Sequence, residues 1–187
     1  MGISLCSKIG KACYIPVGHK SPKCLKKEAV IKKLKKILED PSIKKIGQNI
    51  KFDFIVFYKC GITLSSMEDT MLMSYVLDAG KNRHNMDTLS EIHLGHKTIS
   101  FKEMVGTGKK EINFSEVELD KAKDYAAEDA DVTFRLYKKF IKNLKSEKMI
   151  NIYEIFEKPL IKILAFMEIE GVEIDSKFLK SLSSKFE

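Results

Sequence analysis

The sequence predicts a mixed α/β fold whose C-terminal part is largely helical. Two short runs of strand-forming residues open the chain, strands and helices then alternate, and long segments with helical spacing close it. At 187 residues, with 44% hydrophobic and 32% charged residues, the chain suits a soluble domain with a short appendage. No apolar run approaches the roughly 18 residues of a membrane span and no signal peptide is recognisable, so we expect a cytoplasmic protein without membrane contact.

Short strands and helices are expected to alternate over the first half of the chain. Apolar residues in strand-like runs or at helical spacing, separated by proline and glycine, set the boundaries. The expected elements are a hairpin formed by residues 2–6 and 12–17, a helix at 25–40, a strand at 43–47, a helix at 49–60, a strand at 62–64 and a helix at 69–77.

Helices dominate the expected second half. Residues 80–113 are broken by glycine and lysine, with a helix near 86–94. Ser115 and Glu118 have the spacing of a capping box, which predicts the start of a long helix that ends near residue 145. A further helix is expected at about 153–170, and Ser176 is expected to cap a last one.

Charge and cysteine content say little about partners. The formal net charge is +7, and nearly all of the basic residues are lysines, so the charge points only weakly to polyanions. The four cysteines form no CxxC pair, and no histidine stands at ligand spacing from them. We expect reduced thiols rather than a zinc site or a disulfide.

A first candidate site is the segment 47–53, where a predicted strand runs into a helix. Asn49 and Asp53 are four residues apart, so we expect both on one helical face at the mouth of the sheet, where α/β folds tend to bind ligands. Asp53 stands between Phe52 and Phe54, and a carboxylate in apolar surroundings needs a cation or a metal. A partly exposed helical aspartate without a function is the alternative.

A second candidate site is the segment 125–131, on the predicted long helix. Tyr125 and Asp129 are one helical turn apart and therefore share a face. A carboxylate there can bind Mg²⁺ or Mn²⁺ while the phenol orients an attacking water. A surface Tyr–Asp pair is the alternative. Carboxylates on two elements, each beside aromatic residues that can stack on a base, fit metal-assisted cleavage of a single-stranded 3′ end.

These segments resemble the DEDD exonucleases with a tyrosine in the last motif, in the form of the 3′→5′ proofreading domain of bacterial family A polymerases. GQNIKFD at 47–53 resembles the second motif, and YAAED at 125–129 resembles the third. Residues 82–110 resemble the segment beside the single-stranded 3′ end, and residues 157–175 resemble the opening helices of the polymerase domain. The resemblance implies a ribonuclease H-like mixed sheet flanked by helices, with an incomplete exonuclease domain at 1–150 and the start of a polymerase domain at 151–187.

The resemblance also implies an activity and its residues. The activity is two-metal hydrolysis of the 3′-terminal phosphodiester of single-stranded DNA, with Mg²⁺ or Mn²⁺ and with a polymerase domain in cis if the native gene continues. Asp53 would help to hold the second metal and Asp129 the first, while Tyr125 would orient the nucleophilic water. The positions that match DNA contacts of the family are Gln48, Asn49, Phe52, Arg83 and Phe101.

The sequence departs from the family at the first motif. The family has an Asp-x-Glu on its first, central strand, and no Asp-x-Glu occurs in these 187 residues. We therefore expect an N-terminally truncated fold that lacks two of the four metal-binding carboxylates. If metal assistance supplies on the order of 5 kcal/mol, cleavage would be about 10³–10⁴-fold slower, so the chain is expected to be nearly inactive.

A consequence for the sheet follows from the family's strand order, 3-2-1-4-5. Without the first strand, two edges of unpaired backbone groups would be exposed. We expect either that the opening hairpin pairs with the strand at 43–47 or that a second chain fills the gap. Two other readings remain open: a non-catalytic module that holds single-stranded DNA or stabilises a polymerase, and a decaying gene fragment.

Overall fold

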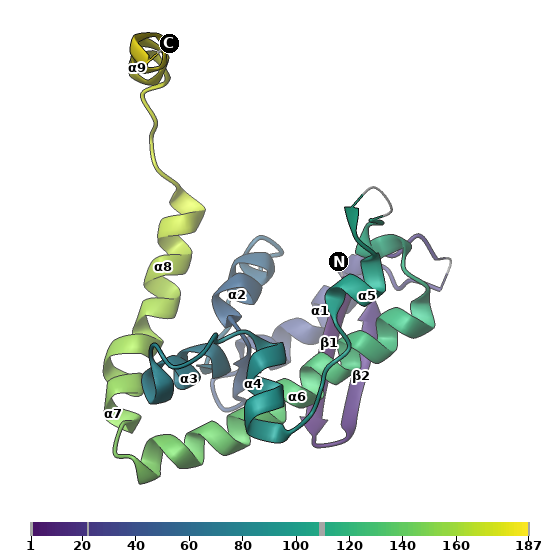
Figure 1. The fold of residues 1–187 in the computed structure, drawn as a ribbon. Helices are drawn as coiled ribbons and strands as arrows, with labels where there is room; N and C mark the ends of the chain where they lie inside the picture. Colours follow the sequence, from purple (N-terminus) through teal and green to yellow (C-terminus); the bar gives the residue numbers. More distant parts are fainter. Residues whose placement is uncertain (1, 22, 109–110, 187) are drawn as a thin grey trace.

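The computed structural model describes residues 2–21, 23–108 and 111–186. Lys109 and Lys110, which end the segment expected beside DNA, lie outside the described residues, as do Met1, Pro22 and Glu187. The described chain is a mixed α/β fold, mostly helical, with two small sheets (Figure 1). The expected mixed α/β class is confirmed.

The hairpin at the N-terminus is confirmed. Strand β1 (Gly2–Lys8) pairs antiparallel with β2 (Lys11–Pro16), so that Ile3 faces Ile15 across the ladder. Gly10 has a φ of 76° in the connecting turn, a backbone conformation that favours glycine. The hairpin lies along a long helix, α6 (Leu119–Ser146), and the backbone N–H of Gly10 donates to Asp131 Oδ1 of that helix at 2.6 Å.

A second, parallel sheet is made by β3 (Lys45–Gly47) and β4 (Met67–Asp69). It follows the expected helix α1 (Lys27–Glu39), and helix α2 (Ile50–Tyr58) connects its two strands. The strand expected at 62–64 is wrong. Its apolar side chains are buried, but its backbone belongs to a loop: the N–H of Ile62 donates to Phe57 O, and the N–H of Thr63 donates to Glu39 Oε1.

The two sheets stay separate, which corrects the expected single sheet. No backbone hydrogen bond joins β1 to β3 among residues 2–21, 23–108 and 111–186, so the expected pairing of the hairpin with the strand at 43–47 is wrong. The reason is that the hairpin is already bound along α6 and held there by the hydrogen bond between Gly10 and Asp131. Pairing with β3 would give up that packing.

The middle of the chain is helical, as expected. Helix α3 (Thr70–Asp78) follows β4, and α4 (Met86–Leu94) confirms the helix expected near 86–94. A short helix, α5 (Phe101–Val105), was not expected, although Ser100 and Glu103 form a capping box at its start. The capping box expected at Ser115 is wrong.

Asn113 forms the capping box instead, with Glu116, and it caps a 3₁₀ turn η2 (Phe114–Glu116) that precedes α6. Ser115 lies inside this turn and its N–H donates to Asn113, while Glu118 precedes α6 without a side-chain capping bond.

The C-terminal helices run α7 (Ile150–Ile152), a π-helical turn η3 (Tyr153–Glu157), α8 (Lys158–Glu170) and α9 (Ser176–Phe186). Asp175 rather than Ser176 caps α9, because its Oδ1 accepts from the N–H groups of Lys177 and Phe178. Helix α8 packs on α2, with Ile161 and Ala165 in the same core cluster as Phe54 of α2. The domain boundary expected at residue 150 therefore separates α8 from α2, although these two helices share a core cluster.

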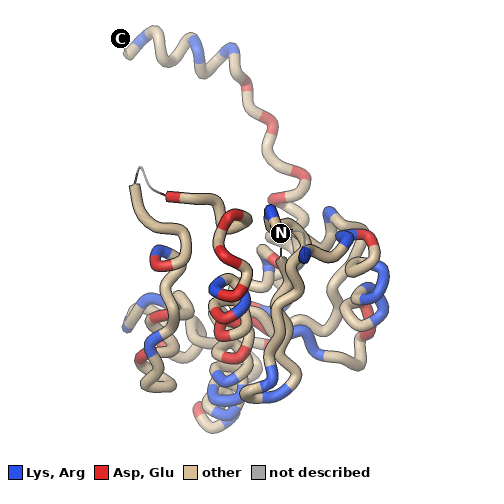
Figure 2. The backbone as a smooth tube through the Cα atoms, turned by 90° about the vertical axis from the view of Figure 1, so that its right-hand side faces the viewer, with Lys and Arg blue, Asp and Glu red and all other residues tan. Residues whose placement is uncertain are grey.

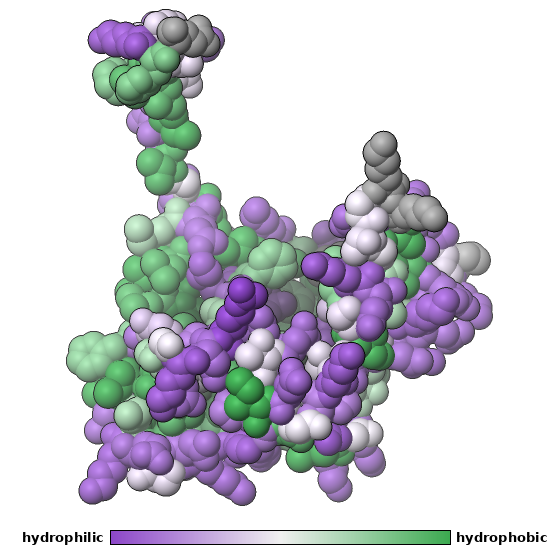
Figure 3. Space-filling view, viewed as in Figure 1, coloured by the Kyte–Doolittle hydropathy of each residue, from purple (hydrophilic) through white to green (hydrophobic). Residues whose placement is uncertain are grey.

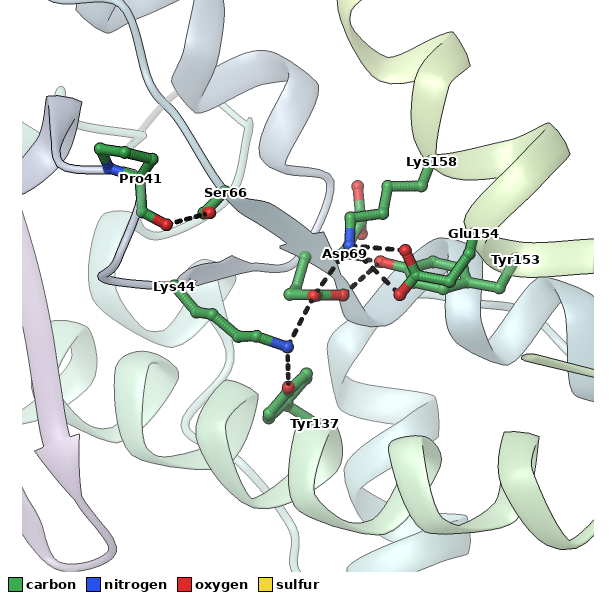
Figure 4. A network of polar contacts seen from close by, with 9 residues as sticks. Pro41, Lys44, Ser66, Asp69, Tyr137, Tyr153, Glu154 and Lys158 are labelled. Carbon is green, nitrogen blue, oxygen red and sulfur yellow. Dashed lines mark hydrogen bonds and ion pairs between the residues drawn. The ribbon is translucent and has the colours of Figure 1, made fainter. Parts of the chain in front are cut away.

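A buried carboxylate ties the C-terminal helices to the second sheet. Glu68 of β4 is 1% exposed; its carboxylate accepts from Lys158 Nζ at 2.9 Å, from Lys44 Nζ at 3.2 Å and from the Tyr153 hydroxyl at 3.1 Å (Figure 4). The backbone N–H of Asp69 donates to the same hydroxyl at 2.9 Å. A buried charge needs such partners, and here they come from β3's leading loop, η3 and α8.

The end of the chain stands away from the rest. Figure 1 shows α9 at the tip of an arm, and Figure 3 shows apolar residues on this arm and on α8. Val172 is 87% exposed, Ile174 65% and Phe178 60%. None of the helices in the described part of the chain is both long and apolar enough to cross a membrane.

Candidate active site

A cavity of about 730 Å³ lies between the two sheets, and both predicted metal-binding aspartates line it. Asp53 reaches it from α2 and Asp129 from α6. The strands β1 and β3 form two of its other walls. The structure therefore brings the two candidate segments, which are 76 residues apart in sequence by the numbering (129 − 53), to one cavity.

Asp53 owes its position to the way the chain turns from β3 into α2. Asn49 precedes the helix in the left-handed conformation, with φ 60° and ψ 49°, so the expectation that Asn49 and Asp53 share a helical face is wrong. Asp69 holds this turn: its carboxylate accepts from the N–H groups of Asn49 and Ile50, each at 3.0 Å. Asp69 itself caps α3 by accepting from Met71 N.

The pKa of Asp53 is raised to about 6, first by burial and then by the negative charge of Asp69. Asp53 is nevertheless classed as exposed by its solvent-accessible surface, although protein atoms surround its carboxyl closely. A carboxylate that lines a cavity and is still reached by solvent can meet a ligand there. A cation placed there would lower this pKa again.

Asp129 lies one turn after Tyr125 on α6. The pKa of Asp129 is raised to about 7, chiefly by burial; a hydrogen bond from Tyr125 lowers it, and the charges of Asp87 and Glu128 raise it. The pKa of Tyr125 is raised, first by burial and then by the charge of Asp129. The phenol therefore stays protonated at neutral pH and can donate a hydrogen bond.

Negative charge is concentrated around this aspartate. Figure 2 shows acidic residues along the first half of α6 and basic residues toward its end. The acidic ones are Asp120, Asp124, Glu128, Asp129 and Asp131. A phosphodiester brought to this half of the helix meets unfavourable charge unless cations accompany it.

An aromatic cluster lies beside Tyr125. The ring of Phe101 stacks on that of Phe114 at 5.9 Å between centroids, and the Tyr125 ring lies 6.2 Å from Phe101 and 5.8 Å from Phe114. Phe101 is 49% exposed, so one face of the cluster is open to a ligand. Phe114 was not among the expected site residues, and only its position just before the long helix could have suggested it.

Glu128 fixes the segment that carries Phe101, a role that the sequence did not suggest. Its Oε2 accepts from the backbone N–H of Ile99 at 2.7 Å, and its Oε1 lies 2.8 Å from His96 Nε2. The carboxylate of Glu128 thus holds residues 96–99, which lead into α5, against α6. The first acidic residue of the YAAED motif therefore orients the aromatic cluster rather than facing the cavity.

The expected DNA-contact residues differ in their surroundings. Gln48 is held within the protein, because its Nε2 donates to His84 O at 2.7 Å and its Oε1 accepts from Thr70. This bond places the loop of Arg83 beside the end of β3. Arg83 and Asn49 are exposed, and Phe52 is 65% exposed.

The donor chemistry fits a hard divalent cation, since Asp53 and Asp129 offer carboxylate oxygens. The two carboxylates supply only part of a coordination shell. Within the described ranges no three Asp, Glu, His or Cys side chains form a group that could hold a metal. The charge of Asp69 raises the pKa of Asp53, whereas the charges of Asp87 and Glu128 raise that of Asp129.

The α/β scaffold thus places carboxylates from two elements at one cavity, with a tyrosine one helical turn from one of them. A family profile described as 3′-5′ exonuclease matches residues 1–145. The chain belongs to the 3′-5′ exonuclease family of the DNA polymerase I type, with a ribonuclease H-like fold.

Curated relatives share this family and are much longer. The chain is 40% identical over 186 residues to a DNA polymerase I of Rhizobium leguminosarum, covering 94% of this chain and 18% of the relative. It is 39% identical over 186 residues to a DNA polymerase I of Pseudomonas aeruginosa, covering 96% and 20%. The chain thus spans about a fifth of the length of these relatives.

Solved structures match the fold. The POL domain of Pol1 from M. smegmatis, in complex with DNA primer-template and dNTP, aligns with a TM-score of 0.71 and 22% identity, over 95% of this chain and 27% of that one. A structure described as the apo form of the nuclease aligns with a TM-score of 0.69 and 18% identity, over 94% and 80%. At these identities the likeness speaks for the fold.

Proposed function

We propose that this chain is the 3′→5′ exonuclease part of a DNA polymerase I and that its site hydrolyses the 3′-terminal phosphodiester of single-stranded DNA. The observation that carries the proposal is that Asp53 and Asp129, from two motifs distant in sequence, line one cavity. Tyr125 and an open aromatic cluster adjoin the second of them. Family membership supports the class of reaction.

Asp53 and Asp129 are the residues proposed to hold Mg²⁺ or Mn²⁺. A divalent cation bound there would neutralise phosphate charge and activate water for in-line displacement. Tyr125, whose raised pKa keeps its hydroxyl protonated, is proposed to orient that water through a hydrogen bond. Glu128 keeps the neighbouring segment in place through Ile99 and His96.

Single-stranded DNA is the proposed substrate, with a polymerase domain in cis as the partner. Phe52 and Phe101 are exposed and can stack on bases, and Arg83 is an exposed cation that can contact a phosphate. Asn49 lies exposed beside them, whereas Gln48 acts through its bond to the Arg83 loop. The segment 151–187 is proposed as the beginning of the polymerase part.

The 187-residue chain itself is proposed to be a slow enzyme. Its sequence contains no Asp-x-Glu, so Asp53 and Asp129 are left to hold a metal with little help. Mg²⁺ is held weakly by one or two carboxylates without further ligands. We expect turnover about 10³–10⁴-fold below that of a site with four carboxylates, which corresponds to about 5 kcal/mol.

The test is trimming of a single-stranded oligonucleotide that carries a label near its 5′ end, with Mg²⁺ or Mn²⁺. The isosteric Asp129→Asn variant should abolish whatever metal-dependent trimming the chain shows. The control is Asp120→Asn, an exposed aspartate of the same helix, which should trim like the unmodified chain. Metal-dependent trimming that survives Asp129→Asn would contradict the proposed role, and turnover equal to that of an intact polymerase I would contradict the proposed slowness.

A second candidate function is a module that holds single-stranded DNA without cutting it. It is favoured by the exposed Phe52 and Phe101 together with a two-carboxylate donor set. This function predicts binding that weakens as salt rises and that Asp129→Asn leaves in place, with no trimming in either metal. The same oligonucleotide, followed by fluorescence anisotropy, separates the two functions.

A further inference from the structure

The second half of helix α6 carries basic side chains without acidic ones. Residues 132–146 contain five lysines and arginines and no aspartate or glutamate, in contrast to the acidic first half of the helix (Figure 2). Arg135, Lys138, Lys139 and Lys142 stand three, four and seven residues apart from the first of them, so they form one stripe along the helix. All four are exposed, and we call them the basic stripe.

A depression in the surface follows the basic stripe. All four residues of the stripe line this depression, whose volume is about 370 Å³, and its other walls include Ile9 and Leu94. Ile9 belongs to the turn between β1 and β2, and Lys8 and Lys11 pair across that turn. A concave surface lined by charge of one sign focuses the electric field and attracts counter-ions. The depression is therefore suited to an anion.

The lysines of the stripe are not neutralised by carboxylates. Lys138, Lys139 and Lys142 form no ion pair with residues 2–21, 23–108 or 111–186. In the first half of the same helix, Lys121 and Lys123 both pair with nearby carboxylates. The difference between the two halves leaves a local excess of positive charge along the stripe.

Contacts with the protein hold parts of the stripe in place. Arg135 Nε donates to Asp131 Oδ2 at 2.7 Å, and Lys139 donates to the backbone carbonyl of His93. Lys138 Nζ lies 5.3 Å from the centre of the Phe134 ring. These contacts order the side chains before a ligand arrives, which reduces the entropy lost on binding.

The basic stripe is separate from the candidate active site. None of its four residues lines the cavity of Asp53 and Asp129. Lys138 comes nine residues after Asp129 (138 − 129), which is about two and a half helical turns, so the two side chains leave opposite faces of α6. A ligand on the stripe is therefore distinct from a strand end held at the two aspartates.

The length of the stripe fits several phosphates of a nucleic-acid backbone. Arg135 and Lys142 are seven residues apart, which is about 10 Å along the helix axis. Each strand of a DNA duplex carries one phosphate per about 3.4 Å of its axis, so about three phosphates of one strand fall along such a length. Lysine and arginine contacts to phosphate position a duplex without reading its bases.

The lining of the depression favours a duplex over a single strand. Single-strand sites combine positive charge with aromatic side chains on which bases stack. Among the described residues, no aromatic one lines this depression, whereas the exposed Phe52 and Phe101 lie elsewhere. An anionic membrane is a poorer partner too, because binding to it requires a broad apolar face beside the cations, and the apolar lining here is limited to Ile9 and Leu94.

We infer that the basic stripe binds the sugar–phosphate backbone of double-stranded DNA, as a second nucleic-acid site of this chain. DNA rather than RNA is chosen because the chain belongs to the polymerase I type of exonuclease family, and this choice rests on the proposed function. The binding is independent of base sequence and weakens steeply with salt, because it depends on release of counter-ions from the backbone.

The inference is tested with a fluorescein-labelled, blunt-ended DNA duplex of about two helical turns, in a chelator so that no metal-dependent cleavage occurs. Anisotropy at several salt concentrations gives the affinity and its salt dependence. The expected result is saturable binding, with changes in the NMR amide signals of residues 135–143 on addition of the duplex. None of these readouts measures hydrolysis, so the outcome is separate from that of the trimming experiment.

A double variant, Lys138→Gln with Lys142→Gln, checks the location. Neither lysine forms a hydrogen bond with the part of the chain that the structure describes, so the variant should fold normally by circular dichroism. It should bind the duplex about tenfold more weakly, with a salt slope lower by about two units. Lys32→Gln with Lys36→Gln is the matched control: it has the same spacing and the same loss of charge on the exposed face of α1, and it should bind like the unmodified chain.

Several outcomes would overturn the inference. These are absence of duplex binding, equal losses in the two double variants, unchanged amide signals at 135–143 on saturation, or an equally large loss of single-strand affinity in the stripe variant. Polyglutamate that displaces the duplex as well as unlabelled duplex does would show a site for any anionic polymer. Tighter binding of an RNA duplex would overturn the choice of DNA, and binding to anionic lipid vesicles without binding to the duplex would show a membrane surface instead.

Discussion

The carboxylate of Asp69 accepts a hydrogen bond from the backbone N–H of Asn49 at 3.0 Å, across the end of the second sheet. Asn49 has a positive φ, and its neighbour Ile50 donates to the other oxygen of the same carboxylate. Because α2 begins at Ile50, the place where Asp53 emerges depends on a side chain from another strand. The candidate site is therefore built on a hydrogen-bonded turn rather than on helix geometry alone.

Asp69→Asn should destabilise the fold, because an amide nitrogen would replace one of two oxygens that each accept from backbone N–H groups. Leaving one such buried donor unpaired costs about 1–3 kcal/mol of unfolding free energy. Urea denaturation followed by circular dichroism measures it. The control is Asp40→Asn, whose carboxylate accepts from Ser42 in an exposed turn and whose replacement should cost less. Equal losses at the two positions would contradict the role given to Asp69.

The contribution of Asp129 to the stability of the metal-free chain should fall as pH rises toward neutrality. The pKa of Asp129 is raised from 3.8 to about 7, so the folded state binds this proton more tightly than the unfolded state. The resulting stabilisation is complete below the unfolded value and is lost as pH rises through about 7. Asp129→Asn removes this titration, so the variant should gain stability relative to the unmodified chain as pH increases.

Urea denaturation of both proteins in the presence of a chelator, at several values between about pH 4 and about pH 8, gives this difference. The same substitution at Asp120, on the exposed side of the helix, controls for the introduction of an amide into α6. A difference between Asp129→Asn and the unmodified chain that does not change with pH would be incompatible with the burial described for Asp129.

Lys158→Met should destabilise the chain because it takes a partner from a carboxylate that is 1% exposed. The loss is expected to be about 1–3 kcal/mol, since Lys44 still pairs with Glu68. Adding Glu68→Gln should recover part of it, and a double-mutant cycle from urea denaturation gives the coupling. Lys123→Met, which breaks exposed ion pairs with Asp120 and Asp124, is the control and should change stability by less than about 1 kcal/mol.

Phe101→Ala should weaken binding of single-stranded DNA if the aromatic cluster stacks on a base. The expected loss is about 1–3 kcal/mol for one stacked base. Fluorescence anisotropy with a labelled oligonucleotide measures it. Phe186→Ala is the matched control, since Phe186 is 83% exposed on α9 and belongs to no described aromatic pair. Equal affinities for the two variants would remove Phe101 from the proposed interface.

Arg83→Ala should lower the salt dependence of DNA binding. A cation that contacts one phosphate contributes about one unit to the slope of log K against log salt. Lys145→Ala is the control, because Lys145 lies twenty residues after Tyr125 on α6, about 30 Å along the helix axis. A slope that changes by the same amount in both variants would indicate nonspecific charge rather than a contact at Arg83.

Much of the helical structure could be predicted from the sequence, because apolar spacing marks the face that a helix buries. The long helix α6 and the hairpin follow their patterns closely. Strand β4 could not be predicted, since two of its three residues, Glu68 and Asp69, are acidic and yet 1% exposed. Their burial depends on Lys158, Tyr153 and backbone donors that come from distant segments.

The main residues of the candidate site could be predicted from the sequence, but the contacts that hold them in place could not. Asp53, Tyr125 and Asp129 stood out by residue type and spacing, and the first and last of these line one cavity. Asn49 was misplaced because a left-handed residue before a helix leaves no periodic signal. Glu128, Asp69 and Phe114 were missed because each acts through a contact with a different segment, which residue spacing does not reveal.

The stretch Gly171–Asp175 should make the C-terminal arm more sensitive to proteases than the helices that precede it. No residue after Ile169 belongs to a core cluster of the described chain, and Val172 is 87% exposed in a loop between two helices. A protease needs a segment that can enter its cleft in extended form, and here one is offered without any unfolding. Brief digestion should therefore cut the arm first, and the product that ends near residue 170 should retain both sheets and the cavity lined by Asp53 and Asp129.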